Sequence, residues 1–387
     1  MNDFRRTIVG LFTEARGLLP ASVNDRVFAL PVRAIDETAE LCDARGWPLV
    51  DLGPRVQCLP EVLGCTEPTL LARLHAEVFG LARPRRVFAA VIPGGRVHTH
   101  ACTAIAPRGI VLADVSPHAR VPLHLHRALS GSIVARQPRR LLGRSALVGG
   151  IGHRNFYHWL FDSLPRIGLV RDAGLDAVDR WIVPATELAV ARELLARAGI
   201  DAGKLEPLGR RDHVVCDELV VTSAPGEVCE PTPRTVDFLR SVLPADRRRV
   251  AGKRVYIARR GRRRIANEAE FAGLLEGFGF TTVAMEGLSL DAQVAAVAGA
   301  EVVLAPHGAA LSHLLHASDG ATVIECMPPG YCNASFFVLA GACRIRYAAL
   351  AGEGETSWNT ANTAAASSRD FVVDRSKLEQ ALTAALA

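Results

Sequence analysis

The chain has 387 residues, of which 49% are hydrophobic and 22% are charged, and its formal net charge at pH 7 is +5. This length predicts two domains or one large two-lobed domain, and the composition is that of a globular protein. The mild positive charge favours small anionic ligands or a weak affinity for an acidic membrane surface, and it argues against a dedicated nucleic-acid binder.

The nine cysteines are odd in number, and no two of them form a CxxC pair. A disulfide framework or a zinc ribbon is therefore not expected, and a reducing cytoplasm fits this pattern best. No run of residues approaches the roughly 18 apolar residues of a membrane-spanning helix. Residues 1–20 are expected to form a short amphipathic helix and not a signal peptide, because they lack a long apolar core and a small-residue cleavage pattern.

Residues 1–145 carry many short strand signals and predict a β-rich N-terminal region. Two HxH pairs lie within it, His98 with His100 and His124 with His126. On a strand, each pair would project from one face, which is a spacing that suits metal ligands. No cysteine or carboxylate completes a ligand set, so a polar sheet face is the favoured interpretation and no metal site is expected.

From residue 146 the pattern changes to alternating strands and helices, which predicts a small Rossmann-like lobe over 146–240. The glycines at 149–152 are a weak phosphate-loop signal, because their spacing is wrong for a dinucleotide fingerprint. Proline and glycine residues then interrupt the pattern near 224–250, where we expect the linker to a second lobe.

The helix predicted after residue 155 carries the first candidate catalytic residues. Asn155 is a suitable N-cap, and His158 and Asp162 are four residues apart, so they share one helix face. A histidine beside a carboxylate is a candidate general-base pair, in which either group could remove a proton. The alternative is a buried structural hydrogen bond among packed aromatic residues.

A second Rossmann-like lobe is predicted over 250–350. It begins with a strand at 254–258, which five arginines follow within the six residues 259–264. At the carboxyl end of a buried strand such a cluster suits a diphosphate, because a guanidinium pairs with phosphate oxygens bidentately. The alternatives are a solvated basic loop and a nucleic-acid patch, and no interleaved aromatic residues support the latter.

Residues 301–325 predict a buried strand, a tight turn, an amphipathic helix and a second buried strand. The turn contains His307, Gly308 and Ala309. A turn from a parallel strand into a helix presents free backbone N–H groups at the carboxyl edge of the sheet, where open α/β sheets bind phosphorylated ligands. The alternative is an ordinary βαβ unit with a satisfied histidine. Residues 351–387 predict a loop and a final helix that braces the lobes.

Three blocks of residues follow one another, in order, between about residues 145 and 326. The first is NFYHWLFD from Asn155 with LPR at 164–166, and the second is YIAR from Tyr256 followed by Arg263, Asn267 and Glu268. The third contains GF at 279–280, EGLS at 286–289, Gln293, PHGAAL at 306–311 and VIE at 323–325. Together these blocks resemble glycosyltransferase family 61, in particular its bacterial members of the capsular-polysaccharide type.

The resemblance implies an α/β, GT-B-like fold, in which two Rossmann-type lobes face a cleft. It implies an inverting, metal-independent transfer of a sugar from a nucleotide-sugar to a hydroxyl acceptor. The first lobe would bring His158 and Asp162 to the acceptor, and one of them would remove the proton. The second lobe would bind the donor through the following residues: Arg259, Arg263, Asn267, Glu268, His307, Gly308, Ala309 and Glu325. His307 is also a candidate catalytic residue, and Glu325 would contact a ribose.

The resemblance further implies that the donor is a UDP-sugar, that no cofactor is needed and that the acceptor is a glycan or another hydroxyl compound. Bacterial members often serve capsule or surface polysaccharide biosynthesis, so we expect a cytoplasmic enzyme that docks loosely, if at all, on the inner face of the membrane. The family usually has Gly-Leu-Thr-Asn where this chain has Ala310-Leu311-Ser312-His313. The sequence leaves open the sugar, the acceptor and the oligomeric state.

Two other functions stay open. A nucleotide-sugar epimerase or a related sugar-phosphate enzyme would form product without an acceptor. A non-catalytic glycan- or nucleotide-binding protein could have kept the fold. The presence of His158, Asp162, Arg259, Arg263 and His307 argues against the second of these, whereas the altered sequence after the HGA motif argues for it.

Overall fold

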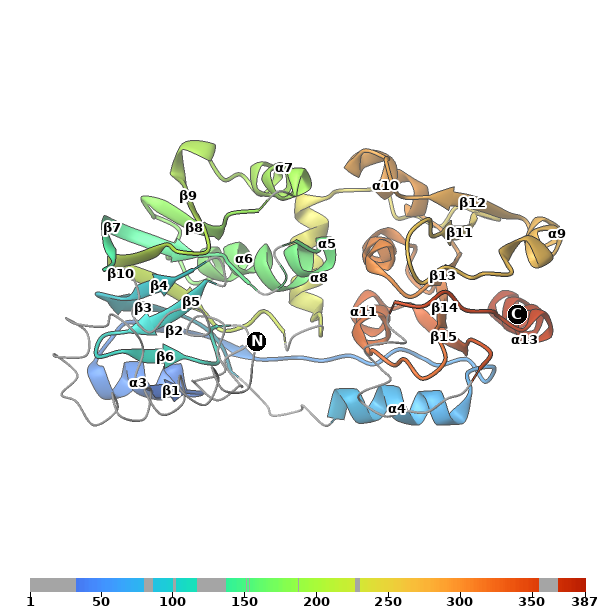
Figure 1. Ribbon diagram of the computed structural model, residues 1–387, viewed down its shortest axis with the longest axis horizontal. Coiled ribbons are helices and arrows are strands. Elements are labelled where there is room, and N and C mark those ends of the chain that lie inside the picture. Colours follow the sequence, from blue (N-terminus) through green and yellow to red (C-terminus); the bar gives the residue numbers. More distant parts are fainter. Residues whose placement is uncertain are drawn as a thin grey trace, which may run out of the picture. The chain divides into compact units, whose positions relative to one another are not determined.

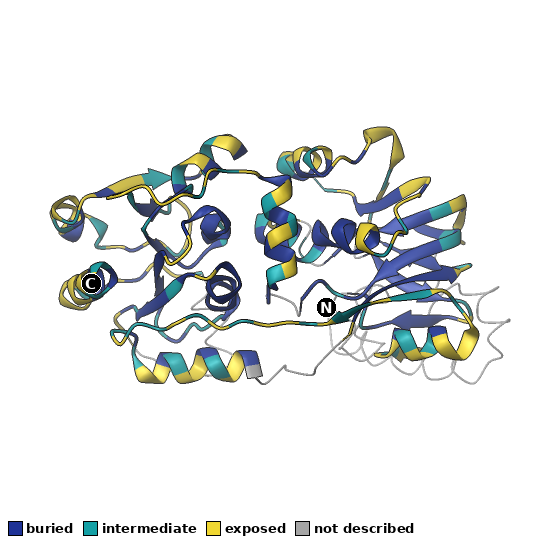
Figure 2. Ribbon diagram, turned by 180° about the vertical axis from the view of Figure 1, so that it is seen from behind, coloured by how far each residue is buried: buried dark blue, intermediate teal, exposed yellow. Residues whose placement is uncertain are grey.

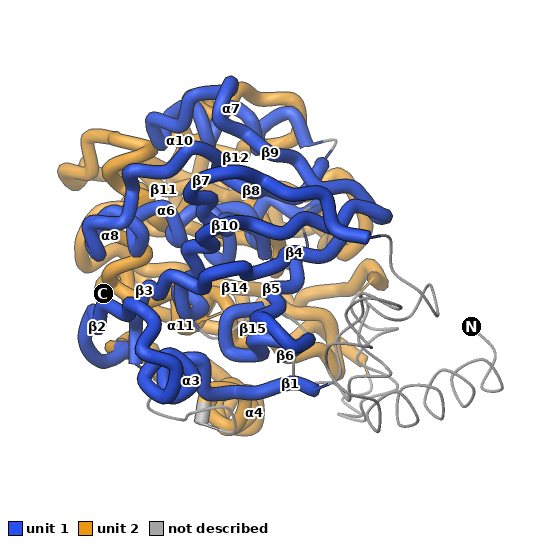
Figure 3. Tube along the Cα trace, turned by 90° about the vertical axis from the view of Figure 1, so that its left-hand side faces the viewer, with its two compact units in different colours: residues 1–55, 84–228 blue, residues 56–83, 229–387 orange. Residues whose placement is uncertain are grey.

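The computed structural model describes residues 33–79, 86–99, 102–116, 137–150, 152, 154–186, 188–226, 230–354 and 368–387 (Figure 1). The chain divides into two compact units, which Figure 3 shows in different colours. Unit 1 comprises Met1–Arg55 and Pro84–Val228, and unit 2 comprises Val56–Arg83 and Cys229–Ala387. The helix predicted over 1–20 and three histidines of the HxH pairs, His100, His124 and His126, lie outside the described residues.

Unit 1 is built on one ten-stranded mixed sheet. Strands β10, β7, β8 and β9 pair in parallel, whereas β3 and β4 pair antiparallel to β10. The strands are β1 (Arg33–Ile35), β2 (Leu49–Pro54), β3 (Arg86–Pro93), β4 (Arg96–His98), β5 (Thr103–Ala106), β6 (Ile110–Leu112), β7 (Arg139–Leu147), β8 (Arg180–Pro184), β9 (Leu205–Leu208) and β10 (His213–Thr222). Its helices are α3 (Thr38–Arg45), α5 (Phe156–His158), the π-helix η2 (Trp159–Ser163), α6 (Pro165–Asp172), α7 (Ala189–Arg197) and the 3-10 helix η3 (Ala202–Lys204).

Unit 2 contains a five-stranded parallel sheet in the order β12-β11-β13-β14-β15. The strands are β11 (Arg254–Ala258), β12 (Phe280–Ala284), β13 (Val302–Pro306), β14 (Thr322–Met327) and β15 (Arg346–Ala351). Its helices are α4 (Pro68–Phe79), α8 (Pro233–Val242), the 3-10 helix η4 (Glu268–Phe271), α9 (Ala272–Gly277), α10 (Leu290–Val297), the 3-10 helix η5 (Ala309–His316), α11 (Ser335–Cys343) and α13 (Arg375–Leu386).

Helices cover both faces of the parallel sheet in unit 2. Leu378 and Leu382 of α13 share a buried cluster with Leu304 of β13 on one face. On the other face, Phe337 of α11 packs edge-on against Tyr347 of β15, with ring centroids 5.2 Å apart. Every residue of β13 and β14 is therefore buried, which explains the apolar run at 302–305 and the largely apolar sequence of β14 (Figure 2). The structure is mixed α/β, as the sequence predicts.

The segment after β13 differs from the sequence expectation. The leucine spacing predicts an amphipathic α-helix, whereas η5 is a 3-10 helix that is buried over residues 311–316. The polar residues Ser312, His313 and His316 are buried together with the leucines. A helix is therefore confirmed after the turn, but the expectation of an exposed polar face was wrong because these polar side chains also pack against protein.

Residues 155–166 also differ from the single helix that the sequence predicts. The α-helix α5 gives way to the π-helix η2, in which the N–H of Leu164 bonds to the carbonyl of Trp159 at 2.9 Å. Pro165 then begins α6. Because proline has no backbone N–H, the α-helical hydrogen-bond ladder cannot continue through this position. The result places one extra residue in the turn that carries Asp162.

Candidate functional site

The parallel sheet of unit 2 brings several of the predicted donor-side residues to its carboxyl edge. Arg259 follows the end of β11, and His307 follows the end of β13. Glu325 lies in β14, opposite Ala305 of β13. The adjacent carboxyl ends of parallel strands thus collect residues that are up to 66 positions apart, counted from Arg259 to Glu325.

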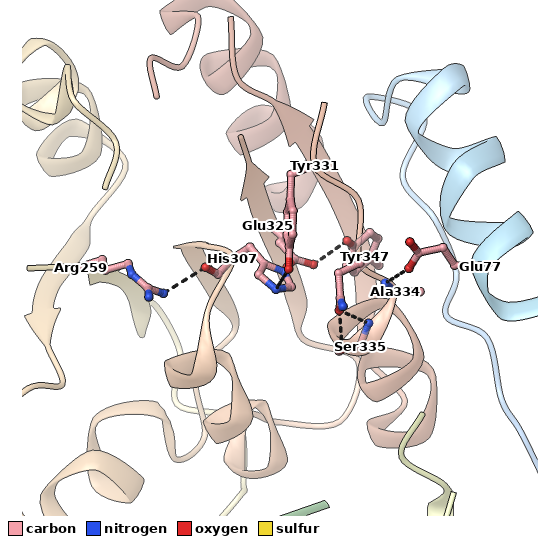
Figure 4. A network of polar contacts seen from close by, with 9 residues as sticks. Glu77, Arg259, His307, Glu325, Tyr331, Ala334, Ser335 and Tyr347 are labelled. Carbon is pink, nitrogen blue, oxygen red and sulfur yellow. Dashed lines mark hydrogen bonds and ion pairs between the residues drawn. The ribbon is translucent and has the colours of Figure 1, made fainter. Parts of the chain in front are cut away.

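His307 contacts a buried carboxylate and one tyrosine, and a second tyrosine holds that carboxylate (Figure 4). Its Nδ1 lies 2.5 Å from Oε1 of Glu325, and the hydroxyl of Tyr347 donates to Oε2 of Glu325 at 2.6 Å. The hydroxyl of Tyr331 lies 3.2 Å from Nε2 of His307. Nδ1 of His307 therefore faces the carboxylate, and Nε2 faces the hydroxyl of Tyr331.

Burial controls the chemistry of this network. Glu325 is fully buried and His307 is 6% exposed. Burial, followed by the charge of Glu325, raises the pKa of Tyr347, so its hydroxyl keeps the proton that it donates. A ribose contact by Glu325, as predicted, would require its carboxylate to exchange one of these internal partners for a sugar hydroxyl.

Arg259 lies across the turn at Gly308. Its Nη1 donates to the carbonyl of His307 at 3.1 Å, and its Nε donates to the carbonyl of Arg262 at 2.5 Å. A Cβ atom at position 308 would overlap Nη1 of Arg259. Gly308 is thus needed for close approach, and not for its backbone conformation, since its φ of 169° is extended.

Arg263 contacts Tyr331, the tyrosine beside His307. Its guanidinium carbon lies 5.1 Å from the ring centroid of Tyr331, which is a cation–π distance. Burial, followed by the charge of Arg263, lowers the pKa of Arg259. The two guanidinium groups therefore repel each other, and a bound anion between them would relieve that repulsion.

The other predicted donor-side residues have different surroundings. Asn267 donates to the carbonyl of Val373 at 2.9 Å and accepts from its N–H at 3.1 Å. Glu268 begins η4, and its charge adds to burial in raising the pKa of Tyr256. Ala309 begins η5 and is partly exposed. Asn267 therefore holds the loop in place, whereas Ala309 lies directly beside the His307 turn.

In unit 1, His158 and Asp162 form the pair that their spacing predicts. Nδ1 of His158 lies 2.6 Å from Oδ2 of Asp162, and the two side chains are 19% and 13% exposed. The side chain of Asn155 accepts from the N–H of Tyr157 at 2.9 Å, which confirms the predicted N-cap. The carboxylate contact fixes the orientation of the imidazole through Nδ1.

A buried arginine fixes the π-helix that carries Asp162. Arg166 is 2% exposed, and its guanidinium donates to the carbonyls of Asp162 at 3.1 Å, Thr222 at 3.1 Å and Val115 at 2.9 Å. Burial lowers the pKa of Arg166 to about 10, although the charge of Asp162 opposes this shift. The LPR sequence therefore has a structural role in tying the π-helix to the sheet.

The glycines that precede this helix also serve packing. A Cβ atom at Gly152 would overlap the ring of His158, and one at Gly149 would overlap the thiol group of Cys102. Gly152 has a φ of +70°, a conformation that glycine adopts readily. These contacts account for the glycines without a phosphate.

Residues 156–324 match the family model described as Glycosyltransferase 61. This match supports the resemblance found in the sequence and a glycosyltransferase activity in general, which requires a glycosyl donor and an acceptor. The matched residues include the His158–Asp162 pair and the His307 turn. No curated protein matches the chain.

The glycosyltransferase 61 match contains the unusual sequence after the HGA motif, and the structure gives His313 a partner there. Nε2 of His313 lies 2.8 Å from Oε1 of Gln293, whose amide donates to the carbonyl of Leu288 at 3.0 Å. Burial lowers the pKa of His313 to about 4, so the ring is neutral at physiological pH. His313 thus acts within the fold and links η5 to the loop before α10.

Sequence reasoning missed three residues around the glycosyltransferase 61 region. Tyr331 and Tyr347 lie beyond the last matched residue. Tyr347 reaches Glu325 because β14 pairs with β15, and Tyr331 reaches His307 from the loop after β14. Glu77 lies far upstream in α4, and its Oε2 accepts from the N–H of Ala334 at 2.9 Å (Figure 4). Burial raises the pKa of Glu77, while the Ala334 N–H and the charge of His307 oppose this shift. No local pattern in the sequence indicates these contacts.

Two further findings concern metals and membranes. Within the described ranges, no group of three or more His, Cys, Asp and Glu side chains has an arrangement that could hold a metal ion. No helix in the part of the chain that the structure describes is long and apolar enough to cross a membrane.

Proposed function

We propose that this protein is an inverting glycosyltransferase that moves a sugar from a nucleotide-sugar, most simply a UDP-sugar, to a hydroxyl acceptor. The observation that carries this proposal is the convergence of Arg259, Arg263 and His307 at the carboxyl edge of the parallel sheet. The edge lies within or directly beside the glycosyltransferase 61 match, and it combines two cations with a small-residue turn. This chemistry suits the diphosphate of a nucleotide-sugar.

On the donor side, the leaving nucleotide diphosphate gains negative charge as its bond to the sugar breaks. Arg259 and Arg263 would stabilise that charge. His307 would donate from Nε2 to a phosphate oxygen as an imidazolium, with Glu325 accepting from its Nδ1. In this proposal, Glu325 and Tyr347 fix the orientation of His307, and the positive groups meet the charge without a metal ion. No other cofactor is required for the transfer.

On the acceptor side, a general base removes the proton of the attacking hydroxyl. The hydroxyl oxygen forms a bond to the anomeric carbon while the bond from that carbon to the diphosphate breaks on the opposite face, which inverts the configuration. His158 would take the proton on Nε2, with Asp162 stabilising the resulting imidazolium, or Asp162 would act as the base itself.

We propose a GT-B-like assignment of the chain. Residues 1–145 would form the β-rich part and 146–240 the Rossmann-like part of the acceptor-side lobe. Residues 250–350 would form the donor-side lobe, with 351–387 bracing the lobes. The parallel sheet with helices on both faces supports the donor-side assignment. A place in capsule or surface polysaccharide biosynthesis, in the cytoplasm or loosely on the inner membrane face, completes the proposal.

A thermal-shift screen with UDP, GDP, CDP and their sugars, with and without a chelator, tests the donor proposal. A ligand that binds only the folded state raises the melting temperature in proportion to the logarithm of its concentration over its Kd. We expect one nucleotide class to give a shift that the chelator leaves unchanged. A shift that the chelator abolishes would contradict the metal-independent mechanism.

The same screen separates the alternatives. No shift with any nucleotide would overturn the donor-site proposal. Conversion of a bound nucleotide-sugar into another nucleotide-sugar without an acceptor would identify an epimerase. Binding without turnover, across a panel of glycan acceptors, would favour a non-catalytic binding protein.

A further inference from the structure

A segment near the C-terminus pairs with the arginine-rich loop of unit 2. The N–H of Phe371 donates to the carbonyl of Arg264 at 3.0 Å, and the N–H of Ala266 donates to the carbonyl of Phe371 at 2.7 Å. Ile265 and Phe371 form an isolated parallel bridge. Phe371 is 4% exposed and belongs to the main core cluster of the unit, so this pairing is anchored in the core.

Asp370 adds a charged contact at the end of this pairing. Its Oδ1 accepts from the backbone N–H of Arg264 at 2.9 Å, and its Oδ2 accepts from Nε and Nη2 of the same residue at 3.1 and 2.9 Å. At the other end, Asn267 bonds both the N–H and the carbonyl of Val373. The loop is therefore fixed at Arg264 and at Asn267, in each case by a residue 106 positions further along the sequence.

Arg263 lies immediately before the residue that Asp370 holds, and its backbone is in the left-handed region with a φ of +69°. A residue with a side chain is rarely found in this conformation, which persists only where the surrounding structure determines it. Two guanidinium-bearing residues follow each other here with different roles. Arg264 forms an ion pair with Asp370, whereas the guanidinium of Arg263 lies over the ring of Tyr331.

We propose that Asp370 is a positioning residue for the donor diphosphate. By holding both the backbone N–H and the guanidinium of Arg264, it keeps Arg263 in its left-handed conformation and directs the Arg263 guanidinium to the group around His307. This inference rests on the proposed function and deepens it. It assigns part of the donor site to a segment that lies beyond the glycosyltransferase 61 match at 156–324. Asp370 itself does not contact the diphosphate.

The charge at this site is consistent with that role. The backbone N–H and the guanidinium of Arg264 lower the pKa of Asp370, so its carboxylate is ionised at neutral pH. An Asp370→Asn substitution keeps the size of the side chain and one acceptor oxygen but loses the charge. Residue 370 is exposed, so this substitution leaves the core intact.

Isothermal titration calorimetry with inorganic pyrophosphate and with UDP tests the inference. We would compare the full-length wild type with Asp370→Asn, Arg264→Ala, Arg263→Ala and the double variant Arg263→Ala/Asp370→Asn. Asp246→Asn is the matched control, because Asp246 forms an exposed ion pair with Arg248 in the same unit. We expect Asp370→Asn and Arg264→Ala each to weaken pyrophosphate binding about tenfold, and the control to bind as the wild type does.

The double variant distinguishes positioning from a general structural effect. If Asp370 acts through Arg263, the double variant binds pyrophosphate no more weakly than Arg263→Ala alone, because the effects do not add. Independent, additive losses would overturn the inference, as would an unchanged affinity in both Asp370→Asn and Arg264→Ala. If the wild type binds neither probe, or if Arg263→Ala binds normally, the donor-site proposal fails first. If Arg263→Ala binds pyrophosphate more weakly than the wild type but Asp370→Asn and Arg264→Ala bind it normally, the inference about Asp370 fails and the donor-site proposal stands.

Discussion

Gly308 lies so close to Arg259 that a Cβ atom at position 308 would overlap the guanidinium Nη1. That guanidinium bonds the carbonyl of His307, so the arginine and the turn form one surface. The absence of a side chain at Gly308 therefore sets the position of a candidate phosphate ligand, although the glycine has an ordinary extended backbone.

The substitution Gly308→Ala tests this relationship. The new methyl group must displace the Arg259 guanidinium, so we expect nucleotide affinity to fall about tenfold, or about 1.4 kcal/mol. Calorimetry with the nucleotide identified by thermal shift measures this change. Gly273→Ala in α9 is the control, because nothing lies within 4 Å of a Cβ atom there. Unchanged affinity in Gly308→Ala would show that Arg259 does not contribute to binding from this position.

The second prediction concerns the general base. We expect Asp162→Asn and His158→Ala each to lower kcat about 10²- to 10⁴-fold, which is the usual contribution of a positioned base. Nucleotide affinity should stay close to that of the wild type, because this pair lies in unit 1 and the arginines lie in unit 2. Glu193→Gln is the control, since Glu193 forms an exposed pair with Arg197 at the same four-residue spacing. Normal transfer by both variants would disprove the assignment.

The third prediction concerns the hydroxyl of Tyr347. Tyr347→Phe leaves Oε2 of the buried Glu325 without its donor, and an unsatisfied buried group of this kind costs about 1–3 kcal/mol. We expect the free energy of unfolding to fall by about that amount in urea denaturation. Tyr331→Phe should cost less, because Tyr331 is partly exposed and water can replace its hydroxyl. Equal losses in the two variants would contradict this account.

The fourth prediction is a loss of stability in acid. Burial lowers the pKa of His313 to about 4 and of His316 to about 3, and nearby positive charges contribute to the second shift. Between about pH 6.5 and those values, the unfolded chain binds protons that the folded chain does not. These two histidines therefore leave the free energy of unfolding unchanged above about pH 6.5. Below that pH, each lowers it by about 1.4 kcal/mol per pH unit.

Urea midpoints at pH 7.5, 6 and 5 for the wild type and His316→Phe measure this effect. Both ring nitrogens of His316 have no hydrogen-bond partner among the described residues, so phenylalanine removes the titrating group without breaking a bond. We expect a shallower pH dependence in the variant. Parallel curves for the two proteins would show that His316 does not titrate as its burial implies.

Local patterns in the sequence determined much of the scaffold. The largely apolar segments at 254–258, 302–305 and 321–324 predict strands, and the structure confirms them as β11, β13 and β14. Continuous apolar sequence is what a parallel strand needs when helices cover both faces of its sheet. The spacing of His158 and Asp162 likewise predicts their contact, because residues four positions apart share a helix face.

Only the tertiary structure decided which distant residues complete each group. Strand order and register place Tyr347 beside Glu325, and the chain brings Asp370 to Arg264 and Glu77 to Ala334 across long separations. It also turned the expected amphipathic helix at 309–316 into a buried 3-10 helix. Periodicity reports only which residues share a face of one element. Contacts between elements depend on how their faces pack, and that information is distributed over the whole chain.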